Sequence, residues 1–154
     1  MTLAVWIKVN ADEGEGQFIS KPWNTWGDYN YYIRFLSDSR IRIRIDGLES
    51  YNLETDNSIS KQEWHHIAGT VDSSKQVKIY IDGIKVKEGT HSITDWNPSD
   101  GDDNRPLTIG TRFPYGDGWA GDTVKSFNGT IDEVMIFNKA LTPAEVKAIY
   151  INQN

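Results

Sequence analysis

Two adjacent histidines, His65 and His66, are the side chains of this 154-residue chain best suited to acid–base or metal chemistry. They begin an alternating stretch that predicts a β-strand, and neighbouring side chains on a strand point to opposite faces. The two imidazoles therefore cannot serve one metal ion or one substrate atom. We expect His65 to be partly buried with a hydrogen-bonded partner, and His66 to share the other face with Trp64 and Ala68.

Other arrangements that support hydrolysis are incomplete. The chain has no Gly-x-Ser-x-Gly, and its sequence assigns no carboxylate to a histidine. Retaining glycosidases need two carboxylates about 5 Å apart. Glu54 and Asp56 begin the phrase that carries such a pair in sandwich glycosidases, but Ile59 stands where the second glutamate belongs. The sequence therefore predicts a protein that is not an enzyme.

Calcium is the metal that the sequence favours. Acidic and amide side chains are concentrated between residues 95 and 104, and such hard oxygen ligands suit a structural Ca²⁺ ion. The predicted ligands in this loop are Asp100, Asp102 and Asp103. Their spacing is not that of an EF-hand, and a solvated acidic loop explains the same composition.

Aromatic side chains in polar loops are the predicted ligand-binding groups. Trp23, Trp26 and Tyr29 recur at every third position, and Tyr31 follows them. Flat rings presented in this way can stack on the apolar C–H face of a sugar, while polar neighbours bind its hydroxyls. The later loops add four further predicted ligand residues: Trp96, Arg112, Tyr115 and Trp119. The alternative is that these rings only cover one end of the fold.

Period-two alternation dominates the chain and predicts an all-β fold. Strands are expected at about residues 3–9, 17–21, 31–37, 40–46, 64–71, 77–82, 84–88, 107–111 and 130–138. Asp-Gly pairs at 46–47 and 82–83 predict two tight hairpins. Arg40, Arg42 and Arg44 alternate with isoleucines, so we interpret them as the solvent face of a strand.

One helix is expected, at the C-terminus. Thr142 and Glu145 form a capping box with Pro143 at the first helical position, and Leu141 and Val146 are placed for a hydrophobic staple. The apolar stripe that follows is too short to be stable without packing on a sheet. We interpret the helix as a lid on the sandwich.

Composition excludes several classes of partner. The formal net charge of −6 argues against a phosphate backbone as ligand, so nucleic acid is not expected. The absence of cysteine excludes disulfides and thiolate metal sites. No apolar run is long enough to span a bilayer, so membrane insertion is not expected either.

Several phrases resemble, in order, those of LamG-like jelly-roll domains of the concanavalin A-like lectin/glucanase superfamily. They include the Trp64-His65-His66 strand with the hairpin ending at Gly83, and residues 129–134 leading into the capping box. The resemblance implies a two-sheet antiparallel β-sandwich (jelly roll) with one short C-terminal helix, formed as a single domain by residues 1–154. Family members often bind calcium at the sandwich rim, which makes Asp132 a further predicted metal ligand.

The resemblance also implies a non-catalytic module excised from a larger extracellular or cell-surface protein. Such domains usually begin with an additional strand before the Trp6 strand. Its absence predicts an open sheet edge and dimerisation through it. We predict a polysaccharide or other glycan as the ligand; the alternative is a structural or adhesive module that binds a cell-surface protein and no sugar.

Overall fold

The computed structural model describes residues 1–12, 14–22, 29–46, 50–94, 106–111 and 126–153. The elements, in chain order, are β1 (Thr2–Val9), β2 (Gly16–Pro22), β3 (Tyr29–Phe35), β4 (Ile41–Asp46), β5 (Ser50–Glu54), β6 (Trp64–Val71), β7 (Gln76–Ile81), β8 (Ile84–Thr90), β9 (Thr108–Ile109), β10 (Gly129–Phe137) and α1 (Pro143–Asn152).

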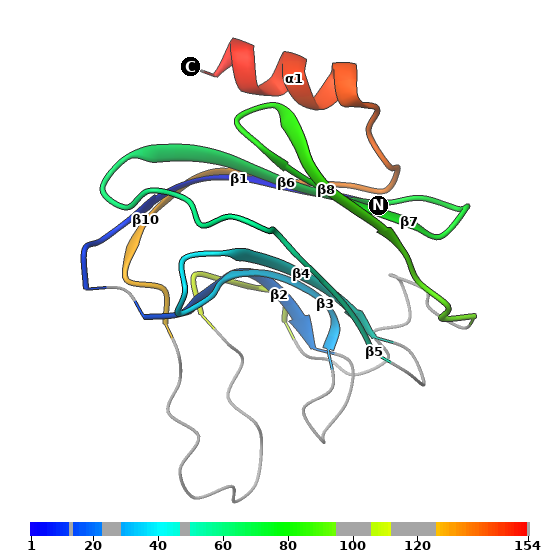
Figure 1. The fold of residues 1–154 in the computed structure, drawn as a ribbon, viewed down its shortest axis with the longest axis horizontal. Helices are drawn as coiled ribbons and strands as arrows, with labels where there is room; N and C mark the ends of the chain where they lie inside the picture. The colour runs from blue at the N-terminus through cyan, green and yellow to red at the C-terminus, as the bar shows by residue number, and fades with distance from the viewer. Residues whose placement is uncertain (13, 23–28, 47–49, 95–105, 112–125, 154) are drawn as a thin grey trace, which may run out of the picture.

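The strands form two antiparallel sheets that pack face to face (Figure 1). Sheet A has the strand order β10-β1-β6-β7-β8, and sheet B has the order β5-β4-β3-β2-β9. Both sheets curve in the same sense, so the outer face of sheet B lies on the inside of the curve, while α1 lies on the outer face of sheet A (Figure 1). The predicted all-β sandwich with a C-terminal helix is confirmed.

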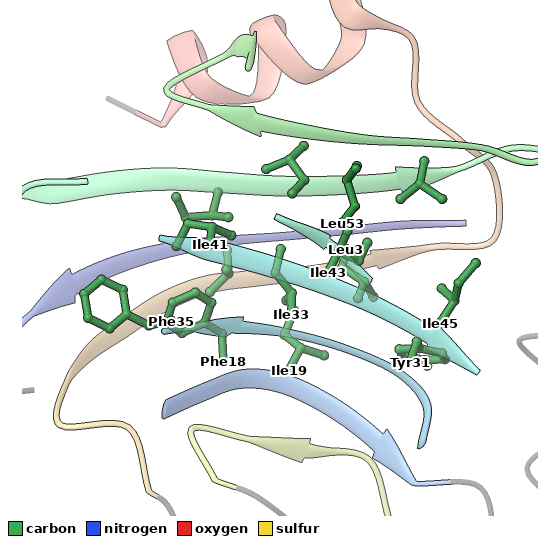
Figure 2. Packing of buried hydrophobic residues seen from close by; sticks show 14 of the residues in the cluster. Leu3, Phe18, Ile19, Tyr31, Ile33, Phe35, Ile41, Ile43, Ile45 and Leu53 are labelled. Atoms are coloured by element: carbon green, nitrogen blue, oxygen red, sulfur yellow. The ribbon is translucent and has the colours of Figure 1, made fainter. Parts of the chain in front are cut away.

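Alternation sends one set of side chains from each sheet into a shared core. On β4, Ile41, Ile43 and Ile45 are 0% exposed, and on β1 the same holds for Leu3 and Val5. Figure 2 shows the labelled members of this core lying between the two sheets. Burying one such side chain contributes roughly 1.5–3 kcal/mol, so the isoleucine repeat fixes which face of β4 points inward.

The helix forms as its sequence predicts. Glu145 N donates to Thr142 Oγ1 at 3.2 Å, and Thr142 N donates to Glu145 Oε2 at 2.7 Å, which completes the capping box. Val146 is fully buried and Leu141 is 6% exposed. Among the described residues, no helix has the length and apolar character needed to cross a membrane.

The helix covers a small apolar cluster on the outer face of sheet A. Ala4, Ala68 and Tyr80 come from three adjacent strands of the sheet and pack with Leu141 and Val146. Two of the three sheet positions are alanines, which leave room for the helix to approach closely. The prediction that the helix is a lid on the sandwich is confirmed.

One of the two predicted Asp-Gly turns has the expected backbone. Asp82 and Gly83 both adopt positive φ, 51° and 75°, and join β7 to β8. Asp46 instead belongs to β4 and pairs with Ser50, so that hairpin is not a two-residue turn. Strand β5 was not predicted; it is a five-residue edge strand in which only Tyr51 and Leu53 turn toward the core.

Candidate functional site

The outer face of sheet B carries polar side chains at the positions between the buried ones. On β4, Arg42 and Arg44 alternate with the three buried isoleucines and are half-buried themselves. On β3, Tyr32 pairs with Arg44 and Arg34 pairs with Arg42, so all four side chains share one face. The prediction that these arginines lie on the outward face of a strand is confirmed for Arg42 and Arg44, whereas Arg40 directly precedes β4.

Carboxylates neutralise these arginines and hold them in place. Arg44 Nε donates to both carboxylate oxygens of Asp46, at 2.7 and 2.8 Å. Arg42 Nε donates to Glu54 Oε1 at 2.7 Å. Each of these two guanidinium groups is thus held by a carboxylate through part of its set of five N–H donors.

Tyr32 lies at the centre of this arrangement. Its side chain is 2% exposed, and the Arg34 guanidinium carbon lies 5.8 Å from the centroid of its ring. Burial disfavours the charged forms of Arg42 and Arg44, but hydrogen bonds to the Tyr32 hydroxyl and to the partner carboxylates outweigh it. The pKa of both guanidinium groups is therefore raised.

Other polar side chains of sheet B are also withdrawn from water. Four of them are 5% exposed or less: Gln17, Ser20, Asn30 and Asp46. The arginines remain the accessible part, because the side chains of Arg34, Arg42 and Arg44 are 21%, 27% and 27% exposed. The site thus consists of a charge-balanced polar layer whose partly exposed guanidinium groups can donate hydrogen bonds to a ligand.

Most of the residues predicted from the sequence cannot be placed. The ligand residues Trp23, Trp26, Trp96, Arg112, Tyr115 and Trp119, and the metal ligands Asp100, Asp102 and Asp103, lie outside the described residues. Tyr29 begins β3 and pairs with Pro22, but its side chain is not described either. These assignments stay predictions.

Two predicted residues can be placed, and neither joins the polar layer of sheet B. Tyr31 is 7% exposed and packs in the core between the sheets, so its ring is not presented at the rim as predicted. The reason is strand periodicity, which gives Tyr32 the outer face and turns Tyr31 inward. Asp132 is exposed on β10, where its Oδ1 accepts a hydrogen bond from Glu133 N at 2.8 Å.

Calcium binding stays a prediction. Within the described part of the chain, no three His, Cys, Asp or Glu residues are grouped in a way that could hold a metal ion. Asp132 therefore does not belong to such a group in that part, and its predicted role depends on the acidic loop of residues 95–105, which is not described.

The two adjacent histidines diverge, as predicted. His65 pairs with Ile7 on the inner face of sheet A and is half-buried, whereas His66 pairs with Trp6 on the outer face and is 0% exposed. One expectation is corrected here. A carboxylate does accompany a histidine, because His65 Nδ1 lies 2.8 Å from Asp82 Oδ2. The chain folds Asp82 back onto β6 through the β7–β8 turn, which sequence spacing alone did not reveal.

A serine completes a row of three groups beside His65. Ser60 Oγ lies 2.8 Å from His65 Nε2 and 2.7 Å from Glu63 Oε2. Ser60 Oγ donates its single hydrogen to Glu63 Oε2, so it is left as an acceptor toward His65. The hydrogen bond to Asp82 raises the pKa of His65. In this arrangement the Ser60 hydrogen points to Glu63 and not to His65, unlike the hydrogen bond of a serine nucleophile to its general base.

His66 has the opposite environment. Its ring centroid lies 5.5 Å from that of Trp6 and 6.2 Å from that of Tyr150 on α1. Neither of its ring nitrogens has a hydrogen-bond partner among the described residues. Burial lowers its pKa to about 4, so the ring is neutral and acts as part of the helix packing.

Sequence reasoning missed the chemical role of sheet B's outer face. The alternation of Arg and Ile on β4 was visible, but it was interpreted only as a solvated surface. The carboxylate partners are Asp46, two residues after Arg44 on the same strand, and Glu54, which pairs with Arg42 from β5. The available signal was the acid two positions after an arginine within an alternating strand.

The family model described as the concanavalin A-like lectin/glucanases superfamily matches residues 1–147, so the chain belongs to this family. A comparison of the sequence with curated proteins found no significant match.

Solved structures share the fold at low sequence identity. The CBM40 of the Ruminococcus gnavus IT-sialidase, bound to alpha2,3 sialyllactose, is 18% identical with a TM-score of 0.78; the match covers 97% of this chain and 81% of that one. Domain 4 of the Geobacillus stearothermophilus arabinanase AbnA, in complex with arabinotriose, is 24% identical with a TM-score of 0.67, covering 97% and 65%. A longer Bacteroides ovatus chain is 19% identical with a TM-score of 0.71, covering 95% of this chain and 39% of its own.

Proposed function

We propose that this protein is a non-catalytic module that binds a glycan through the outer face of sheet B. The observation that carries the proposal is the charge-balanced layer of Arg34, Arg42 and Arg44 on the inside of the curve. Guanidinium groups held in place by carboxylates lose little conformational freedom when they bind sugar hydroxyls or a sugar carboxylate.

The charge balance narrows the ligand class. Each of these three arginines has a carboxylate partner, so the face has no surplus of positive charge to displace counterions from a phosphate backbone. Neutral or weakly acidic polysaccharide suits the face better. The similarity to two structures solved with bound oligosaccharides supports the same class, although their sequences differ widely from this one.

The aromatic loops complete the proposed site. Trp23 and Trp26 precede β3, and Tyr115 and Trp119 lie between β9 and β10, two strands that belong to different sheets. We propose that their rings stack on the sugar while the arginines orient its hydroxyls. Extracellular location, calcium bound by Asp132 with the acidic loop, and attachment to a larger protein belong to the same proposal.

Affinity gel electrophoresis with arabinan, xylan, β-glucan, pectin and sialylated mucin tests the binding. We expect the wild-type protein to be retarded by at least one polysaccharide and Arg44→Ala to lose most of that retardation. Lys85→Ala is the matched control, because it removes an exposed cation from β8 of sheet A. Migration unaffected by every polysaccharide would contradict glycan binding and favour a structural or adhesive module. Retardation that survives in Arg44→Ala and Arg42→Ala would show that the outer face of sheet B is not the binding site.

A further inference from the structure

The outer face of sheet A is only partly covered by α1. Helix α1 ends at Asn152, and the Gln153 side chain then bonds to Trp6 Nε1 at 3.2 Å and to Glu133 Oε2 at 3.3 Å. Gln153 therefore lies over the row of the sheet that contains Trp6. Sheet A extends beyond the C-terminal end of the helix (Figure 1).

The next row of the same face is uncovered. Trp64 on β6 pairs with Lys8 on β1, and Lys8 pairs with Thr130 on β10. Alternation places all three on the face of Trp6 and His66, two residues along each strand. Trp64 is 43% exposed and Thr130 is exposed, while Lys8 is half-buried. Three neighbouring strands at ordinary spacing make this row about 10 Å wide.

The three side chains have no partners in the described part of the chain. The Trp64 indole makes no ring contact and no hydrogen bond there, and neither the Lys8 ammonium group nor the Thr130 hydroxyl is engaged. This contrasts with Trp6, one row away, whose N–H is bonded and whose ring stacks on Tyr150 at 5.6 Å. An indole left exposed beside free donors has the chemistry of a binding platform and is not needed to complete the core.

We propose that Trp64, Lys8 and Thr130 form a second glycan-binding site, on the sheet opposite the proposed primary site. The indole offers an apolar surface for the C–H face of a pyranose ring, while the ammonium and hydroxyl groups bind its hydroxyls. Asp132 pairs with Trp6 at the border of the row and adds an exposed acceptor. The end of α1 with Gln153 forms a wall along one side, which favours a short oligosaccharide lying along the row.

Charge and polarity argue for a sugar over another partner. The row combines one aromatic ring, one cation and one hydroxyl, with Asp132 and Glu133 beside it, so it is neither an extended apolar patch nor a basic surface. A protein interface of ordinary size would need a larger continuous area than this row provides. A second site on the opposite sheet would let one module bind two points of a polysaccharide and gain avidity.

Protein-detected NMR of the intact chain distinguishes the two sites. The Trp64 indole N–H signal is assigned by its loss in Trp64→Phe and followed during titration with arabinotriose, xylotriose and 3′-sialyllactose. We expect this signal to shift with at least one probe, and Trp64→Ala to weaken that binding event on the order of tenfold, the loss of about 1.4 kcal/mol of stacking. Ile84→Ala, which shortens another exposed apolar side chain of sheet A, should leave it unchanged.

The outcomes separate the two proposals. Shifts confined to residues of sheet B overturn the second site and leave the proposed function intact. A Trp64 shift that persists in Arg44→Ala supports the second site independently of the first. A concentration-dependent dimer in sedimentation that Trp64→Ala abolishes would overturn the sugar assignment and make the row a contact between copies. Retained far-UV circular dichroism in each variant shows that folding is not the cause.

Discussion

The outer faces of the two sheets arise from the same alternation but have different chemistry. On sheet A, Ala4, Ala68 and Tyr80 are fully buried because α1 covers them. On sheet B, the equivalent positions hold arginines paired with carboxylates. The difference shows that alternation in the sequence identifies which side chains share a face of a sheet, but not whether that face is packed against another element or exposed. What decides the role is whether another element of the chain packs on that face.

The largest loss of stability is expected when an arginine, the residue type found on the outer face of sheet B, is introduced on the outer face of sheet A. Ala68→Arg places a cation between sheet A and α1, within the apolar cluster formed by Ala4, Tyr80, Leu141 and Val146. A buried charge without a partner destabilises by about 3–5 kcal/mol. Urea unfolding should show this loss together with reduced helix content, and Ala68→Ser, which adds less volume and no charge, should lose much less. Near-wild-type stability in Ala68→Arg would mean that α1 is not firmly docked.

The buried histidine of sheet A predicts a pH dependence. Burial lowers the pKa of His66 to about 4 from an ordinary value of 6.5. The unfolded chain therefore binds a proton that the folded chain excludes between these values. The contribution of neutral His66 to the free energy of unfolding should be fully present above about pH 6.5. It should fall by about 3 kcal/mol as the pH drops to about 4.

His66→Gln isolates this effect, because glutamine does not titrate. Denaturant unfolding at several pH values should show a shallower acid loss in the variant than in the wild type. Equal slopes for the two proteins between pH 6.5 and 4 would contradict a buried neutral His66. Tryptophan fluorescence adds a local readout, since Trp6 and Tyr150 both contact the ring.

The neighbouring histidine should respond in the opposite direction. The hydrogen bond to Asp82 raises the pKa of His65, so its stabilising contribution is complete below the ordinary value and is lost as the pH rises through the raised one. Asp82→Asn removes the charge but keeps an acceptor for His66 N and a side chain that tolerates the positive φ. We expect a loss of about 2 kcal/mol near pH 6.

NMR titration of the His65 ring gives the direct measurement. Its pKa should fall towards the ordinary value in Asp82→Asn, while that of His66 should stay low. A His65 pKa that does not change in the variant would show that another group supplies the stabilising charge.

The smallest loss of stability is expected for a substitution on the outer face of sheet B. Arg42→Met should cost less than about 1 kcal/mol of stability, because the pair with Glu54 is partly exposed and its attraction is offset by solvent screening and side-chain entropy. Thermal unfolding measures this directly. A loss as large as that of Ala68→Arg would show that sheet B's outer face is a structural layer, and the contrast between the two faces would disappear.

Local signals in the sequence were sufficient for much of the fold. The isoleucine repeat of β4, the capping box at Thr142 and the Asp82-Gly83 turn each depend on residues a few positions apart, and each prediction is confirmed. The edge strand β5 was missed because its alternation spans only five residues, of which Leu53 alone is buried. The divergence of His65 and His66 also followed from sequence, since backbone geometry alone enforces it.

Contacts between distant segments were decided only by the tertiary structure. The sequence could not show that Asp82 meets His65, that Tyr32 interacts with both Arg42 and Arg44, or that Tyr31 belongs to the core. Nor could it show that α1 ends one row short of Trp64, which leaves that indole exposed. Alternation assigns side chains to faces, but strand order and register determine which faces meet, and those depend on the packing of the whole chain.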